Sequence, residues 1–292
     1  MTIHSISIKQ NQYLAYILSD TEALSRLEVV PERGGMITQW KIQGQDILYL
    51  DQGRFSNPAL SVRGGIPILF PICGNLPNDQ YHYDNQSYSL KQHGFARDLP
   101  WSIVGQDTEN GASLSLSLRS SEQTKQVYPF DFELRFTYLL RGNSLRIQQQ
   151  FQNHSAVAMP FSIGLHPYFQ VSNKAQLSFD IPSNTLQNQK DQTTSAFSGN
   201  FDFETSEIDV AFTQLSQSVA SFTDLQKSLQ IKITYDDLYA NLVFWTLKEK
   251  EFICLEPWSA PRNALNNQIN LTYIQPGKIL ESSVEFMVSY LT

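Results

Sequence analysis

Residues 112–118 read Ala-Ser-Leu-Ser-Leu-Ser-Leu, so that serine and leucine alternate through the segment. Side chains of a β-strand point alternately to opposite faces, and this spacing places the leucines on one face and the serines on the other. A strand with one apolar and one polar face is typical of an antiparallel sheet that covers a core on one side. The segment therefore predicts a half-buried strand of an antiparallel sheet.

Similar alternation, or enrichment in β-branched and aromatic residues, recurs along the chain and indicates further strands. They are expected at residues 13–18, 26–30, 36–42, 132–140, 144–151, 229–235, 242–246 and 283–290. No stretch of a dozen residues has helical periodicity, and short helical turns are expected only near 51–55 and 221–227. Turn motifs such as Arg33-Gly34-Gly35 separate the strands.

These patterns predict an all-β fold, one large antiparallel β-sandwich with few short helices. A sandwich of this kind often exceeds 200 residues as one unit, so residues 1–292 are expected to form a single domain. The Asn- and Gln-rich residues 184–200 are expected to form a long surface excursion. No change of composition around them marks an interdomain linker.

The composition excludes several classes of function. The formal net charge is −7, so there is no overall positive field to attract nucleic acid or an anionic membrane. Cys73 and Cys254 lie in apolar runs without the paired spacing of a zinc or redox site, and are expected to be reduced, buried thiols. No signal-like start or long apolar segment is present, which predicts a soluble cytoplasmic protein.

Two residues stand out as candidates for proton transfer. His166 follows the apolar residues 159–165 and precedes a proline, which predicts a strand end at the rim of a sheet. Glu256 interrupts an apolar run at what is expected to be the end of a buried strand, where burial would raise its pKa toward that of a general base. The alternative for Glu256 is a structural ion pair with an arginine. Tyr168 and Phe169 provide apolar surface either for a sugar ring or for the core.

The segment 61–71, which contains Arg63-Gly64-Gly65, combines a guanidinium group with two flexible positions. The glycines are expected to let the backbone approach a ligand, and Arg63 offers several donors to hydroxyl or phosphate oxygens. It is neither a P-loop nor a dinucleotide-binding loop, because the residues that complete those motifs are missing. No cofactor is therefore expected.

Four motifs occur in order: RGGIPILFP at 63–71, KQHGFAR at 91–97, GLHPYF at 164–169 and LEPW at 255–258. Together with the opening residues 29–49, they resemble the aldose 1-epimerase (galactose mutarotase) family over nearly the whole chain. The HGFAR form resembles the branch that contains hexose-6-phosphate mutarotases.

This resemblance implies a galactose mutarotase-like supersandwich with the sugar site on one concave sheet. By position in the motifs, His166 matches the general acid that protonates the ring oxygen, and Glu256 matches the base that takes the proton of the anomeric hydroxyl. His93 matches a second histidine that holds the ring side of the sugar, and Arg63 matches a substrate-binding arginine. Outside the four motifs, Asp209 in the stretch Glu-Ile-Asp-Val-Ala-Phe at 207–212 resembles the family aspartate that binds sugar hydroxyls.

The implied reaction is the interconversion of α and β anomers by ring opening and reclosure, which requires no metal, nucleotide or covalent intermediate. The expected partner is a small sugar or sugar phosphate, bound by a monomer or homodimer. Arg63, Arg97 and Lys91 are candidates to receive a 6-phosphate, which is slightly preferred over a free hexose. Two alternatives remain: a non-catalytic sugar-binding or regulatory protein, and a glycoside hydrolase in which Asp209 supplies a second carboxylate.

Overall fold

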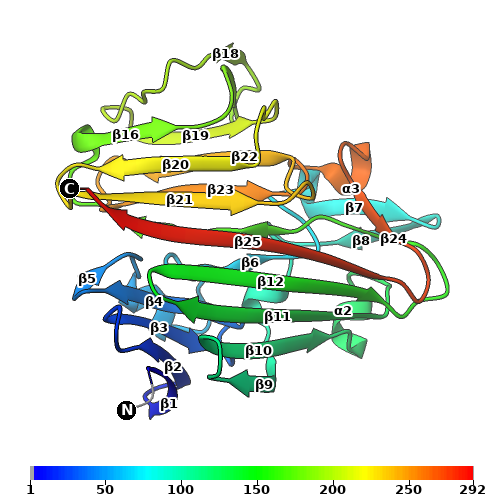
Figure 1. Cartoon of the computed structure of the whole chain (residues 1–292). Helices are drawn as coiled ribbons and strands as arrows, with labels where there is room; N and C mark the ends of the chain where they lie inside the picture. Colours follow the sequence, from blue (N-terminus) through cyan, green and yellow to red (C-terminus); the bar gives the residue numbers. More distant parts are fainter. Residues whose placement is uncertain (1–2, 292) are drawn as a thin grey trace.

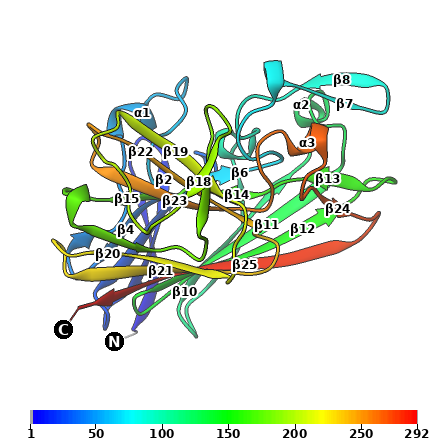
Figure 2. The same cartoon turned by 90° about the horizontal axis from the view of Figure 1, so that it is seen from above.

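The computed structural model describes residues 3–291 and consists mainly of antiparallel strands in packed layers (Figure 1). The front layer is an eight-stranded sheet, and Figure 2 shows a second large sheet lying across its inner face. The front sheet comprises, in spatial order, β16 (Leu177–Asp180), β20 (Val219–Asp224), β21 (Leu229–Tyr235), β25 (Ile279–Tyr290), β12 (Ser144–Asn153), β11 (Phe132–Arg141), β10 (Ala112–Arg119) and β9 (Ser102–Asp107).

Strand β10 contains the alternating serine and leucine residues, and its burial follows that pattern. Leu114, Leu116 and Leu118 are buried in the main hydrophobic core. Ser115 lies on the other face, where its hydroxyl group is 2.7 Å from that of Thr137 on β11. The predicted half-buried antiparallel strand is therefore confirmed.

Truncation of one of these leucines should destabilise the fold strongly. Leu116→Ala removes a fully buried side chain, and we expect the free energy of unfolding to fall by about 2–5 kcal/mol. Ser113→Ala, on the partly exposed face of the same strand, is the control and should change it by less than about 0.5 kcal/mol. Urea denaturation of both variants measures the difference, and equal losses would contradict the assignment of faces.

The second large sheet carries the site described below. Its strands are, in spatial order, β18 (Thr194–Ala196), β17 (Thr185–Asn188), β19 (Glu207–Phe212), β22 (Asn241–Leu247), β23 (Phe252–Trp258), β14 (Gly164–Leu165) and β6 (Ile68–Leu69), and β15 (Tyr168–Gln170) also pairs with β23. One face of this sheet packs on the front sheet through residues such as Phe244 and Leu255. The opposite face is therefore free to line a cavity.

The N-terminal segment forms a separate five-stranded sheet. It contains β1 (His4–Gln10), β2 (Leu14–Asp20), β3 (Ser25–Val30), β4 (Met36–Ile42) and β5 (Gln45–Asp46). Two small sheets pair β7 (Gln80–Tyr83) with β8 (Gln86–Ser89) and β13 (Met159–Phe161) with β24 (Thr272–Ile274). The α-helices are short: α1 (Gln52–Ser56), α2 (Glu122–Lys125) and α3 (Ala264–Asn267). The predicted all-β sandwich with few short helices is confirmed.

Two local predictions differ from the structure. Residues 221–227 were expected to form a helical turn, but Ser221 to Asp224 belong to β20, which pairs on both sides with β16 and β21. This pairing satisfies the backbone groups that a helix would have used. Residues 184–200 contain β17 and β18 at the edge of the second sheet, so the expected excursion is partly a hairpin. Among residues 3–291, every helix is too short or too polar to cross a membrane.

Candidate active site

His166 and Glu256 face each other because of strand register. Strands β14 and β15 pair with β23 in one shared register, through Gly164 on β14 and Tyr168–Gln170 on β15, with a break between them at residues 165–167. Continued across that break, the register sets His166 opposite Glu256, and directly opposed residues point to the same face. Glu256 lies inside β23, not at its end as expected, because Pro257 stays within the strand opposite Leu242 of β22.

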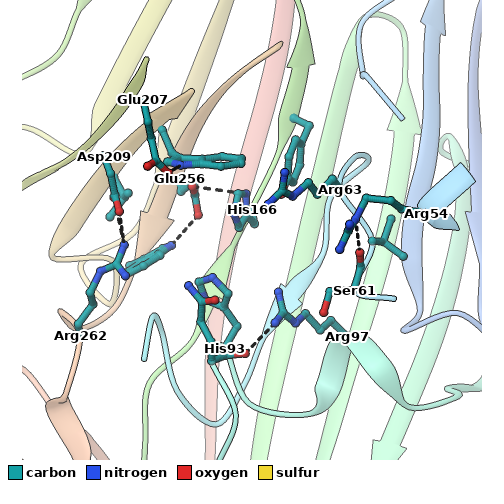
Figure 3. Close-up of a pocket in the computed structure, with 16 residues that line it drawn as sticks. Arg54, Ser61, Arg63, His93, Arg97, His166, Glu207, Asp209, Glu256 and Arg262 are labelled. Atoms are coloured by element: carbon teal, nitrogen blue, oxygen red, sulfur yellow. Dashed lines mark hydrogen bonds and ion pairs between the residues drawn. The ribbon is translucent and has the colours of Figure 1, made fainter. Parts of the chain in front are cut away.

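The two side chains are in close contact on the floor of a cavity. His166 Nδ1 lies 3.4 Å from Glu256 Oε1, although the geometry is not that of a hydrogen bond and Nδ1 is buried without a partner. Trp258 Nε1 donates to Glu256 Oε2 at 3.0 Å, which fixes the carboxyl group (Figure 3). Only 7% of His166 and 1% of Glu256 is exposed.

Burial acts in opposite directions on the pKa values of this pair, because it disfavours the charged form of each group. It raises the pKa of Glu256 well above its ordinary value, partly offset by the hydrogen bond from Trp258. Burial, together with the smaller effect of the positive charge of Arg97, lowers the pKa of His166 to about 3. In the free protein at neutral pH the pair therefore favours a neutral imidazole beside a carboxyl group that readily holds a proton.

His93 is held in one tautomer. The backbone N–H of Gly74 donates to His93 Nδ1 at 3.0 Å, so a neutral ring carries its proton on Nε2. Burial lowers the pKa of His93 well below its ordinary value, which keeps the ring neutral. The His93 ring lies edge-on to that of His166, with centroids 5.6 Å apart. His93 thus offers a fixed N–H donor next to the pair.

Three arginines gather on one side of the cavity (Figure 3). Arg97 donates to the carbonyl of Gln92 at 2.7 Å, and Arg54 donates to the carbonyl of Ser61 at 2.9 Å. The guanidinium group of Arg63 lies 5.8 Å from the centre of the Trp245 ring. Within residues 3–291, none of the three forms a salt bridge with a carboxylate, so their charges are available to an anion.

The opposite side of the cavity carries paired charges. Arg262 donates to both carboxylate oxygens of Asp209, at 3.0 and 2.9 Å. Glu207, two residues before Asp209 on β19, accepts from Trp245 Nε1 at 2.9 Å and pairs with Lys190. This side therefore offers hydroxyl-binding groups without a free positive charge.

The double glycine has a different role from the one expected. A Cβ atom on Gly65 would lie 2.1 Å from the carbonyl oxygen of Ile37, and one on Gly64 would lie 2.5 Å from Leu50 Cα. Both glycines have positive φ angles. They permit close approach between protein backbones rather than to a ligand, and this packing positions Arg63.

All six predicted site residues line one cavity of about 330 Å³, which is in the range of small-molecule sites. They are Arg63, His93, Arg97, His166, Asp209 and Glu256. Lys91 does not line it: the side chain is exposed and borders a separate hollow next to α2.

The lining residues that the sequence analysis did not identify include Arg54, Glu207, Trp245 and Arg262. Glu207 was detectable, because residues two apart on a strand share a face and Asp209 had been singled out. No local signal pointed to Arg54, Trp245 or Arg262 as members of the site.

The site of this β-sandwich combines a buried imidazole–carboxylate pair with unpaired guanidinium groups on one side and carboxylates on the other. These groups are suited to acid–base chemistry on a polar small molecule. Residues 21–287 match the aldose 1-epimerase family, so the chain belongs to that family.

Individual relatives agree with this assignment. The crystal structure of the Slr1438 protein from Synechocystis sp. PCC 6803 is 48% identical, covers 98% of this chain and 99% of its own, and superposes with a TM-score of 0.95. The galactose 1-epimerase structure from Lactobacillus acidophilus has the same fold at 14% identity, with a TM-score of 0.78 and full coverage of both chains. A curated relative from Cenchrus ciliaris, named "Putative glucose-6-phosphate 1-epimerase", is 27% identical over 77% of this chain and 72% of its own.

Proposed function

We propose that this protein is an aldose 1-epimerase that interconverts the α and β anomers of a hexose 6-phosphate. The observation that carries the proposal is the 3.4 Å contact between His166 Nδ1 and Glu256 Oε1 in the cavity. Ring opening needs a proton removed from the anomeric hydroxyl and another delivered to the ring oxygen. An imidazole and a carboxylate side by side can act as the acid that donates one proton and the base that accepts the other.

The pair would work by sharing one proton. In ring opening, the Glu256 carboxylate takes the proton of the anomeric hydroxyl while protonated His166 gives its proton to the ring oxygen. This leaves the open aldehyde with a protonated glutamate and a neutral histidine. After rotation about the C1–C2 bond, the reverse transfers close the ring as the other anomer. Both protonation states of the pair are therefore used in each turnover.

The preference for a 6-phosphate rests on Arg54, Arg63 and Arg97. Guanidinium groups bind phosphate oxygens through charge-assisted hydrogen bonds, and these three lack carboxylate partners among residues 3–291. On the other side, the Asp209–Arg262 pair and the fixed N–H of His93 would bind sugar hydroxyls. A pyranose lying between the two sides would present its anomeric centre to Glu256 and His166.

A bound phosphate would also adjust the proton-transfer pair. The charges of Arg97 and Arg63 lower the pKa of His166. An anion that neutralises them would raise this pKa toward its ordinary value and so favour the protonated imidazole that opens the ring. Phosphate recognition and catalysis would therefore be coupled through electrostatics.

Polarimetry of freshly dissolved α-anomers tests the proposal. We expect the protein to accelerate the approach to equilibrium for glucose 6-phosphate and to act more weakly on glucose and galactose. If none of these sugars, nor galactose 6-phosphate, equilibrates faster than in buffer, the epimerase proposal is wrong. Sugar binding measured by calorimetry in that case would identify a non-catalytic sugar-binding protein.

The pH profile should respond to Trp258. The proposed reaction requires that His166 and Glu256 together hold one proton. The activity should therefore fall at high pH, when Glu256, whose pKa is raised, loses this proton. The hydrogen bond from Trp258 stabilises the carboxylate, and its removal in Trp258→Phe should raise the pKa of Glu256 further. A hydrogen bond to a charged group contributes about 1.5–3 kcal/mol. The alkaline limb of the pH–activity profile should therefore shift to higher pH by roughly one to two units in Trp258→Phe.

Trp245→Phe is the matched control, because the Trp245 indole donates to Glu207 and not to Glu256. Its alkaline limb should stay at the wild-type position even if its rate falls. If the alkaline limb shifts to lower pH in Trp258→Phe, the pKa of Glu256 does not determine the position of this limb.

A further inference from the structure

Three potential metal ligands lie close together in the second large sheet. His166 and Glu256 line the cavity, and Cys254 is fully buried beside them. His166, Cys254 and Glu256 each place one ligand atom in a group whose members lie within 4.8 Å of one another, and all three residues are buried. His166 Nδ1 has no hydrogen-bond partner and lies 3.4 Å from Glu256 Oε1. Tetrahedral zinc with bonds of about 2.0–2.3 Å separates its ligands by roughly 3.3–3.8 Å, so the His166–Glu256 spacing already fits.

The group is a product of strand geometry. Cys254 and Glu256 are two residues apart on β23 and therefore point to the same face, and the register places His166 opposite Glu256. The Cys254 sulfur lies within 4.8 Å of the ligand atoms of the other two residues, so a small movement is enough to close the group. His166 comes from a segment far from β23 in the chain, so the spacing of the three ligands in the sequence does not resemble a zinc motif.

We propose that His166, Glu256 and Cys254 bind a thiophilic divalent cation such as Zn²⁺, which blocks the sugar site. On binding, the Cys254 thiol releases its proton to solvent, Glu256 binds as a carboxylate and His166 as a neutral imidazole. The two negative ligands balance the charge of the ion, and a water molecule from the cavity completes a four-coordinate site. The metal site itself is independent of the proposed epimerase activity; only its inhibitory effect rests on that activity.

The surroundings predict selectivity among cations. Arg63, Arg97 and Arg262 line the same cavity, and their positive charge opposes any cation held by electrostatics alone. Zn²⁺ and Co²⁺ gain from the thiolate and imidazole ligands, whereas Mg²⁺ and Ca²⁺ prefer oxygen ligands and would have only one carboxylate here. We therefore expect Mg²⁺ and Ca²⁺ not to bind.

Cobalt titration of the metal-free full-length protein tests the site directly. Co²⁺ should bind with one equivalent and produce a thiolate-to-metal charge-transfer absorption, which Zn²⁺ abolishes by displacement. In Cys254→Ala, the absorption should disappear and Zn²⁺ affinity should fall at least about tenfold. Cys73→Ala is the matched control, since Cys73 is equally buried but lies outside the ligand group, and it should behave as wild type. Cys254→Val fills the space of the thiol and replaces Cys254→Ala in this test if the alanine variant does not fold.

Activity assays separate this inference from the proposed function. In an active enzyme, Zn²⁺ should raise the KM for the sugar without changing kcat, and the Cys254 variant should be active and at least about tenfold less sensitive. If the protein is inactive but the cobalt spectrum appears, the epimerase proposal fails and the metal site stands. A cobalt spectrum without a thiolate band, or equal Zn²⁺ affinity in wild type and both Cys254 variants, would overturn the metal site.

Discussion

Glu256→Gln should lower the rate of anomer interconversion by about 10²–10⁴-fold, the usual contribution of general acid–base catalysis. Glutamine has nearly the same size and can still accept the hydrogen bond from Trp258, but it cannot take up or release the proton. Its neutral amide also avoids burying a charge, so the fold should remain intact. His166→Asn removes the other member of the pair and should cause a comparable loss. Polarimetry gives the rates, and thermal unfolding checks the fold.

Glu207→Gln is the matched control for this prediction. Glu207 is a carboxylate of the same cavity, but it contacts Trp245 and Lys190 on the side that we propose binds sugar hydroxyls. Its substitution should mainly raise KM and leave kcat within about tenfold, because ground-state binding is lost rather than proton transfer. Full activity in Glu256→Gln or in His166→Asn would contradict the assignment of the pair.

Removal of two unpaired arginine charges should abolish most of the preference for phosphorylated sugar. A hydrogen bond to a charged group contributes about 1.5–3 kcal/mol, or roughly 10–100-fold in kcat/KM. The double variant Arg54→Gln/Arg97→Gln should therefore lower kcat/KM for glucose 6-phosphate by about 10²–10⁴-fold. For unphosphorylated glucose, the change should be much smaller. Steady-state assays with both sugars give the comparison.

Lys91→Gln is the control for the arginine variant. Lys91 belongs to the same HGFAR-containing segment as Arg97 but lies outside the cavity, so its loss should leave both substrates unaffected. An equal loss for glucose and glucose 6-phosphate in the arginine double variant would show that these residues support the fold of the site and do not recognise phosphate.

The strands were predictable because their signal is local. Residues 36–42 and 229–235 coincide with β4 and β21, since alternating burial depends only on the direction of successive side chains. The error at residues 221–227 has the opposite origin. Ser221 and its neighbours form a strand because they pair with β21, which follows after a short turn, and with β16, which lies much earlier in the chain. Residues 221–227 taken alone indicate neither partner.

The site was predictable only in part. Five of the six predicted site residues lie in the four motifs, and the family resemblance added Asp209 as the sixth. Nothing in the sequence indicated the strand register that places His166 opposite Glu256. The sequence analysis also placed Glu256 at a strand end, since a proline normally ends a strand. Pro257 is tolerated because β14 pairs with β23 only at Gly164 and Trp258, so the ladder on that side already stops next to Pro257. Arg262 reaches Asp209 from the segment after β23, a contact that depends on the complete fold.

Anomer exchange measured by NMR tests the central claim most directly. Magnetisation transfer between the α and β anomeric protons of glucose 6-phosphate at equilibrium reports ring opening and closure without a coupling enzyme. We predict an exchange rate that rises in proportion to protein concentration and falls to the buffer rate with the double variant His166→Asn/Glu256→Gln. An exchange rate in wild-type protein equal to that in buffer, for this sugar and for free glucose and galactose, would contradict the account.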